Sequence, residues 1–142
     1  MDTSETYINM CDCEEIKGVW NPIEGDYFWE GMEMRIATDY ENWSGDVSYV
    51  LEFPKAVWLP RQDQIQEMMR DYYAEGIKPI RPRAWFPEGV VGLTYVLKKF
   101  NEFAPPDGLT AHEVKSFEQL WLKFYMYEKH NKVWDGDKWV ST

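Results

Sequence analysis

The 142-residue chain is poor in cysteine and in long apolar runs. Its two cysteines, Cys11 and Cys13, are separated by one residue, which is poor geometry for bridging each other, and two cysteines cannot build a disulfide framework. No run of about 18 apolar residues occurs, and no charged segment followed by an apolar one opens the chain, so neither a membrane span nor a signal peptide is expected. We therefore expect a soluble protein in the reducing cytoplasm.

Residue sets that carry common enzyme chemistry are also missing. The sequence has no Ser-His-Asp set, no phosphate-cradling glycine-rich loop and no activated cysteine environment. Zinc needs four ligands at a recognisable spacing, and the only histidines, His112 and His130, lie about a hundred residues beyond the cysteines. The sequence therefore predicts no catalytic residue, no metal and no cofactor, and the thiols are expected to be structural.

Basic residues are scarce in the first third of the chain. Residues 1–52 carry 13 acidic side chains against only Lys17 and Arg35, a balance of −11, whereas residues 53–142 carry 12 acidic and 13 basic ones. Such a front disfavours contact with phosphate, which needs cations to displace counterions. The excess of acidic residues has three possible interpretations, which stay open: the segment binds a basic partner, it imitates nucleic acid, or it forms an acidic face exposed to solvent.

The front of the chain predicts a helix followed by strands. Ser4 to Lys17 shows helical spacing with Ser4 as a cap, and Gly18 ends it. Met32, Met34 and Ile36 alternate with polar neighbours, as in a half-buried strand. The same alternation over residues 47–53 predicts a further strand, so residues 19–59 are expected to form an acidic antiparallel β-meander. A small barrel of the SH3 type and a curled sheet packed on helices both satisfy this pattern.

The remaining chain predicts three helices and a hairpin. Apolar stripes indicate helices from Pro60 to Ala74 and from Val90 to Phe103. Ser116 is the preferred cap of a third helix, with a preliminary turn at Thr110. Asp135-Gly136 is typical of a hairpin turn that pairs Trp134 with Trp139. The expected fold is α+β in a single domain, residues 1–142, with parts at 1–18, 19–59, 60–131 and 132–142.

Two segments are candidates for binding. The first is a polar run that follows an aromatic residue: Trp58, Arg61, Gln62, Asp63 and Gln64. Its four consecutive polar residues exceed what a helix cap needs, although they also suit a structural role in capping the helix and tying it to the meander by hydrogen bonds.

The second candidate combines cations with an aromatic ring in a proline-rich stretch over residues 77–87: Lys78, Arg81, Arg83 and Trp85. Such residues stack on bases and neutralise phosphates, but three cations are few. The alternative is a basic arm that pairs with the acidic front of the same chain.

Two stretches carry a resemblance to a known group. WLPRQDQIQEM at Trp58–Met68 and FEQLWLKFYMYEKHNKVWDGDKWV at Phe117–Val140 resemble segments of small, uncharacterised proteins of bacteriophages and prophages, and WNPIEGDYF at Trp20–Phe28 agrees more loosely. The chain departs from the group at His130-Asn131, where Tyr-Gly is more usual. The resemblance brings no activity, cofactor or catalytic residue, and it implies a phage origin and a location inside a host bacterium.

These observations favour a non-catalytic accessory protein of phage origin that binds a host or phage protein through a polar and aromatic surface. The alternative is a role related to nucleic acid. It takes the form of direct binding through residues 78–86 or of DNA mimicry by the acidic front.

Overall fold

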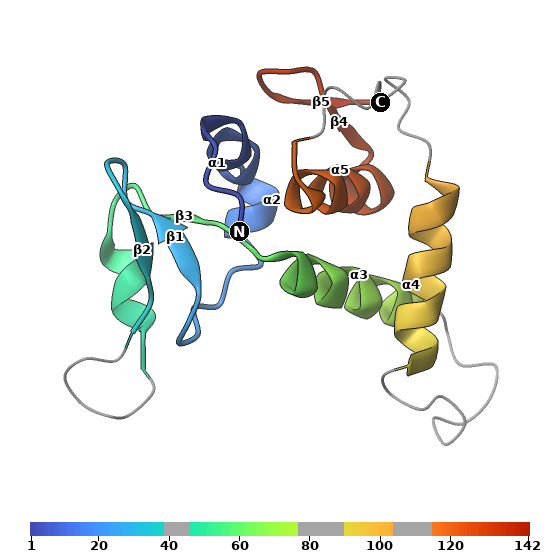
Figure 1. The fold of residues 1–142 in the computed structure, drawn as a ribbon, viewed down its shortest axis with the longest axis horizontal. Helices are drawn as coiled ribbons and strands as arrows, with labels where there is room; N and C mark the ends of the chain where they lie inside the picture. Colours follow the sequence, from blue (N-terminus) through green and yellow to red (C-terminus); the bar gives the residue numbers. More distant parts are fainter. Residues whose placement is uncertain (39–45, 77–89, 104–114) are drawn as a thin grey trace. The chain divides into compact units, whose positions relative to one another are not determined.

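The protein has an α+β fold, in agreement with the sequence (Figure 1). The computed structural model describes residues 1–38, 46–76, 90–103 and 115–142. They belong to two compact units: unit 1 comprises Met1–Arg61 and Trp134–Trp139, and unit 2 comprises Gln62–Val133 and Val140–Thr142. The single domain expected from the chain length stays a prediction.

The expected N-terminal helix is divided into α1, Glu5–Cys11, and α2, Glu14–Lys17. Ser4 caps α1 as predicted, because its side chain accepts a hydrogen bond from the backbone N–H of Tyr7. In one continuous helix, Ile16 would lie about 180° around the axis from Tyr7. Two side chains on opposite sides of one helix cannot both face the same core. The break at Asp12 and Cys13 changes the direction of the chain, and both Tyr7 and Ile16 are fully buried.

The sheet of unit 1 has three short strands: β1, Tyr27–Trp29; β2, Met34–Ile36; and β3, Val57–Trp58. β1 and β2 form a hairpin whose turn contains Gly31 at a φ of 91°, a left-handed conformation that favours glycine. β3 pairs antiparallel with the other edge of β1. The strand order is therefore β2-β1-β3, rather than the consecutive order of a meander.

The strand predicted over residues 47–53 is wrong, because this segment forms the 3-10 helix η1, Ser48–Glu52. The buried residues are Val47 and Val50, whose spacing of three matches one turn of a 3-10 helix and overrides the alternating pattern. Asp46 favours the turn, since its carboxylate accepts the backbone N–H of Ser48. The segment packs on the sheet through Phe53, whose ring lies 5.9 Å from that of Phe28.

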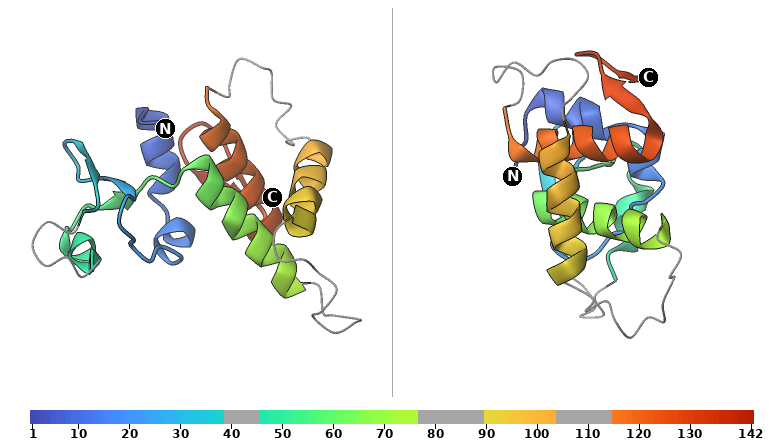
Figure 2. Two further views of the ribbon diagram at one scale, coloured as in Figure 1. Left: turned by 60° about the horizontal axis from the view of Figure 1, so that its bottom comes forward. Right: turned by 90° about the vertical axis from the view of Figure 1, so that its right-hand side faces the viewer.

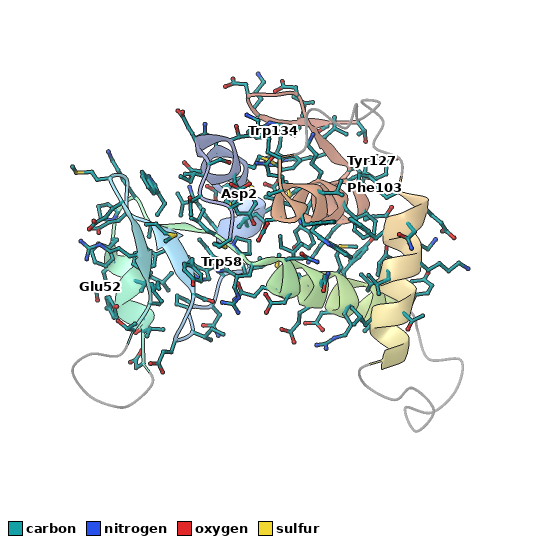
Figure 3. All side chains as sticks on the ribbon, viewed as in Figure 1. Asp2, Glu52, Trp58, Phe103, Tyr127 and Trp134 are labelled. Atoms are coloured by element: carbon teal, nitrogen blue, oxygen red, sulfur yellow. The ribbon has the colours of Figure 1, made fainter. Side chains whose placement is uncertain are left out.

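Unit 2 is built on the three predicted helices: α3, Gln62–Gly76; α4, Val90–Glu102; and α5, Phe117–His130. Figure 2 shows α4 running steeply across α3 and α5. Ser116 caps α5 as predicted, by accepting the backbone N–H of Gln119. Phe100 of α4 stacks on Trp121 of α5 with ring centroids 3.9 Å apart. Nearby, Phe103 packs on Tyr127 (Figure 3).

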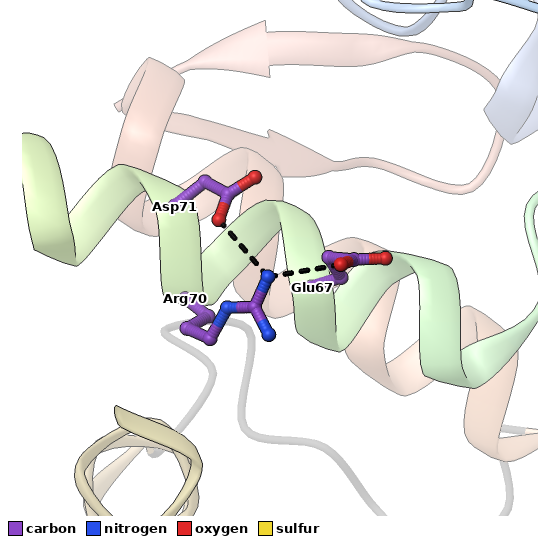
Figure 4. Close-up of polar contacts among 3 residues, drawn as sticks. All are labelled: Glu67, Arg70 and Asp71. Atoms are coloured by element: carbon purple, nitrogen blue, oxygen red, sulfur yellow. Dashed lines mark hydrogen bonds and ion pairs between the residues drawn. The ribbon is translucent and has the colours of Figure 1, made fainter. Parts of the chain in front are cut away.

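Hydrogen bonds join α3 to α5 beside this aromatic core. The Tyr72 hydroxyl donates to the carbonyl of Glu128, and the Tyr73 hydroxyl donates to its carboxylate at 2.8 Å. Burial and the bond to Glu128 raise the pKa of Tyr73, so its hydroxyl stays protonated and acts as the hydrogen-bond donor. On the exposed side of α3, Arg70 pairs with Glu67 and Asp71 (Figure 4), and such exposed ion pairs contribute little to stability.

The predicted C-terminal hairpin is present as β4, Lys132–Trp134, and β5, Trp139–Ser141. Its two indoles meet edge to face, with the centroids of Trp134 and Trp139 5.2 Å apart. The Trp139 N–H donates to the carbonyl of Met10 in α1 at 2.8 Å. The preceding helix ends at Asn131, which has a φ of 52°. Asparagine tolerates this left-handed position, so it ends the helix where glycine is the more usual residue.

We expect Trp121→Ala to lower the free energy of unfolding by about 3–5 kcal/mol, since it removes a buried ring that packs on Phe100 and Phe124. The matched control is Phe117→Ala on the same helix, because Phe117 is 65% exposed. Its effect should stay within about 0.5 kcal/mol. Urea denaturation followed by circular dichroism measures both, and equal losses for the two variants would contradict the packing described.

Candidate functional site

Trp58, the first residue of the candidate polar site, lies in the interior of unit 1. The residue is only 7% exposed, and its ring stacks parallel to that of Trp20, with an interplanar angle of 2° and centroids 6.2 Å apart. Among the residues that the structure describes, no atom accepts a hydrogen bond from its indole N–H. Trp58 therefore contributes packing to unit 1 and no ring to its surface.

The three residues that follow Trp58 are each bonded to another part of unit 1. Leu59 donates its backbone N–H to the carbonyl of Tyr27 at 2.9 Å. The Tyr7 hydroxyl of α1 donates to the carbonyl of Pro60, and the Arg61 guanidinium donates to the carbonyl of Gly25 at 3.2 Å. These bonds favour the structural interpretation of the Trp58–Arg61 stretch, in which it ties the chain to the sheet.

The rest of the polar run begins α3 in unit 2. Gln62 and Gln64 are half-buried, and Asp63 is exposed in the first helical turn, where a carboxylate complements the helix dipole. The candidate site is thus divided between units at Arg61 and Gln62. A binding role for this run stays a prediction.

The second candidate, the basic and aromatic set of the proline-rich stretch, lies outside the described residues. Binding of nucleic acid through it also stays a prediction, and its members are Lys78, Arg81, Arg83 and Trp85.

One acidic side chain of unit 1, Asp26, is buried and has a structural role. Its carboxylate accepts the indole N–H of Trp20 and the backbone N–H of Ile23, both at 3.1 Å. Gly25 next to it has a φ of 91°. Asp26 therefore fixes both the turn before β1 and the ring on which Trp58 stacks.

The net charge of the protein resides in unit 1. This unit contains 15 acidic and 5 basic residues, a formal charge of −10, whereas unit 2 contains 10 of each. Most of the acidic side chains described in unit 1 are exposed: Glu5, Asp12, Glu14, Glu24, Glu33, Asp46, Glu52, Asp135 and Asp137. The structure thus sharpens the charge asymmetry that the sequence shows.

One face of the β1-β2 hairpin is apolar and open to solvent, and sequence reasoning missed it. Arg35 pairs with Glu30 and Glu33 and lies over Phe53 on one face of the sheet. By the alternation of strand residues, four apolar side chains share the opposite face: Tyr27, Trp29, Met34 and Ile36. Tyr27 and Trp29 are partly exposed on this face.

The half-burial expected for β2 is therefore wrong. Met34 is 38% exposed, Ile36 is 45% exposed, and Met32 in the hairpin turn is 91% exposed. The alternation was correct, but η1 packs on the charged side of the hairpin through Phe53. The sequence has no signal for which face is covered, because Tyr27, Phe28 and Trp29 place aromatic rings on both faces of β1.

The two thiols are poorly suited to nucleophilic chemistry. Burial raises the pKa of Cys11 well above its usual value, and burial also raises the pKa of Cys13 to about 11. Within the described ranges, no group of three or more His, Cys, Asp or Glu side chains is arranged to hold a metal ion. None of the helices in those ranges has the length and apolarity needed to cross a membrane.

Comparisons with protein-family models, with curated proteins and with solved structures find no match to this chain. The resemblance of Trp58–Met68 and Phe117–Val140 to proteins of bacteriophages and prophages therefore stays a prediction.

Arg61→Ala should lower the free energy of unfolding by about 1–2 kcal/mol, because the guanidinium donates to the Gly25 carbonyl. Gln62→Ala, at the next position, is the control and should change it by less than about 0.5 kcal/mol. Thermal unfolding compares the two, and an Arg61→Ala protein as stable as wild type would argue against a structural role for this side chain.

Iodoacetamide should modify Cys13 about 100-fold more slowly in the native protein than in urea at pH 8, because a pKa raised from 9.0 to about 11 leaves that much less thiolate. The native rate should then rise steeply between pH 9 and pH 11. Mass spectrometry of the alkylated chain over time gives both rates. Equal rates in the native and unfolded chain at pH 8 would show that the thiol is not protected.

Proposed function

We propose that this chain is a non-catalytic protein-interaction module of a bacteriophage or prophage, acting in the host cell, whose unit 1 binds a basic host or phage protein. The observation that carries the proposal is the combination, within unit 1, of a formal charge of −10 and an open apolar face on the β1-β2 hairpin. Charge of one sign steers an oppositely charged partner toward the surface, and apolar side chains supply contact area once it arrives.

Two further observations support this proposal. The raised pKa values of Cys11 and Cys13 make both thiols weak nucleophiles at neutral pH, in line with a role without covalent catalysis. The resemblance of Trp58–Met68 and Phe117–Val140 to phage and prophage proteins supports the origin and the expected setting in a bacterial host.

The same charge supports a second candidate, in which unit 1 imitates nucleic acid and occupies the DNA-binding surface of its partner. The two candidates differ in one property. Duplex DNA displaces a mimic from its partner, whereas it leaves a partner bound elsewhere in place.

The test is recovery of a partner from a lysate of bacteria that carry the phage or prophage. We expect the tagged protein to retain a basic protein in an amount nearly equal to its own. The retained amount should fall as the salt concentration is raised, because screening weakens attraction between exposed charges. Neutralising three exposed carboxylates of unit 1, with Glu5→Gln, Glu24→Gln and Glu52→Gln, should reduce recovery at least fivefold.

The control neutralises three exposed carboxylates of unit 2, with Glu67→Gln, Asp71→Asn and Glu102→Gln, and should leave recovery unchanged. Equal recovery by the two triple variants, or no retained basic protein, would overturn the proposal. Release of the partner by added duplex DNA would favour the mimic.

A further inference from the structure

The outer edge of β2 has backbone groups that point away from the sheet. Ala37 donates its N–H to Asp26, and Glu33 accepts the N–H of Glu30, so residues 33 and 37 face β1. Arg35, opposite Phe28, faces β1 as well. Since strand residues alternate in direction, the N–H and C=O groups of Met34 and Ile36 point outward. Within the described part of the chain, β2 pairs with β1 alone.

This edge adjoins the apolar face of the hairpin. The side chains of Met34 and Ile36 flank those of Trp29 and Tyr27, which are opposite them in register. A strand added at the edge of β2 would place every second side chain on this face. Exposed edges of this kind accept extended segments, with main-chain hydrogen bonds providing affinity and alternate side chains providing specificity.

A second copy of the chain does not suit this edge. An antiparallel pair of β2 strands that uses the outward groups of both Met34 and Ile36 puts Arg35 directly opposite Arg35 of the other copy. Like charges in that position destabilise a strand pair. The charge of −10 on each unit 1 adds to the repulsion between identical copies.

From this geometry we infer that β2 is the docking edge for an extended, basic and apolar segment of the partner protein. The inference rests on the proposed function and adds the binding site to it. The segment places apolar side chains beside Met34 and Ile36, an uncharged side chain opposite Arg35, and a lysine or arginine opposite Glu33. Charge complementarity with unit 1 selects this class of segment over neutral or acidic ones.

The test uses the full chain, labelled with 15N, and the peptide Lys-Lys-Val-Thr-Val-Lys-Lys, whose symmetric sequence fits β2 in either direction. We expect the largest chemical-shift changes, together with slower hydrogen exchange, at the amides of Met34 and Ile36. A charge-matched control peptide, Lys-Lys-Gly-Ser-Gly-Lys-Lys, should bind at least tenfold more weakly.

Two substitutions at one position separate strand addition from attraction by charge. Ile36→Pro removes an outward N–H and leaves pairing with β1 in place, so it should weaken binding of the first peptide at least tenfold. Ile36→Val keeps the N–H and the apolar face and should bind within about twofold of wild type. The shifts of Phe28 and Arg35 check that the hairpin of each variant is intact.

Binding that is unchanged in Ile36→Pro, or that the two peptides share equally, would overturn the docking edge. The proposed function would still stand if the triple variant of unit 1 with neutralised carboxylates loses its cellular partner. Loss of that partner in Ile36→Pro but not in Ile36→Val would show that the cellular partner binds at the same edge of β2 as the peptide.

Discussion

Contact between aromatic rings is the interaction on which each unit depends. The strands of unit 1 have two or three residues each and are too short to be stable by backbone pairing alone. Phe28 compensates for this, because its buried ring contacts Trp20 and Phe53 while its backbone pairs with both neighbouring strands. In unit 2 the same role falls to Phe100 and Trp121, which hold α4 against α5. The high aromatic content of the sequence, 17%, is thus largely explained by packing.

Local signals in the sequence predicted most of the helices and the terminal hairpin. Ser4 and Ser116 cap helices where expected, and the turn at Asp135 and Gly136 brings Trp134 against Trp139. These features depend on residues within a few positions of one another, so the sequence contains the information needed to place them. The interruption of the N-terminal helix at Asp12 and Cys13 was not predicted, because it depends on the tertiary contacts that bury Ile16.

The errors in the sheet have the same origin. Alternation over residues 47–53 suits a strand, yet burial of Val47 and Val50 selects a 3-10 helix. The apolar face of the hairpin illustrates the point most clearly, because Met34 and Ile36 follow the alternation of a half-buried strand and yet are exposed. The structural bond of Arg61 to the carbonyl of Gly25 likewise joins residues that lie far apart in the sequence. Which face of a small sheet is covered depends on distant segments, and periodicity alone does not contain that information.

The open edge of β2 also affects the colloidal behaviour of the protein. An exposed strand edge beside apolar side chains favours edge-to-edge association of a protein with itself. At neutral pH the charge of −10 opposes the association of identical copies. Near the isoelectric point, at a pH of about 4.6, this repulsion disappears while the edge and its apolar face remain. The acidity of unit 1 therefore has a role independent of any partner, because it opposes pairing between the outer edges of two β2 strands, which are unpaired within the described part of the chain.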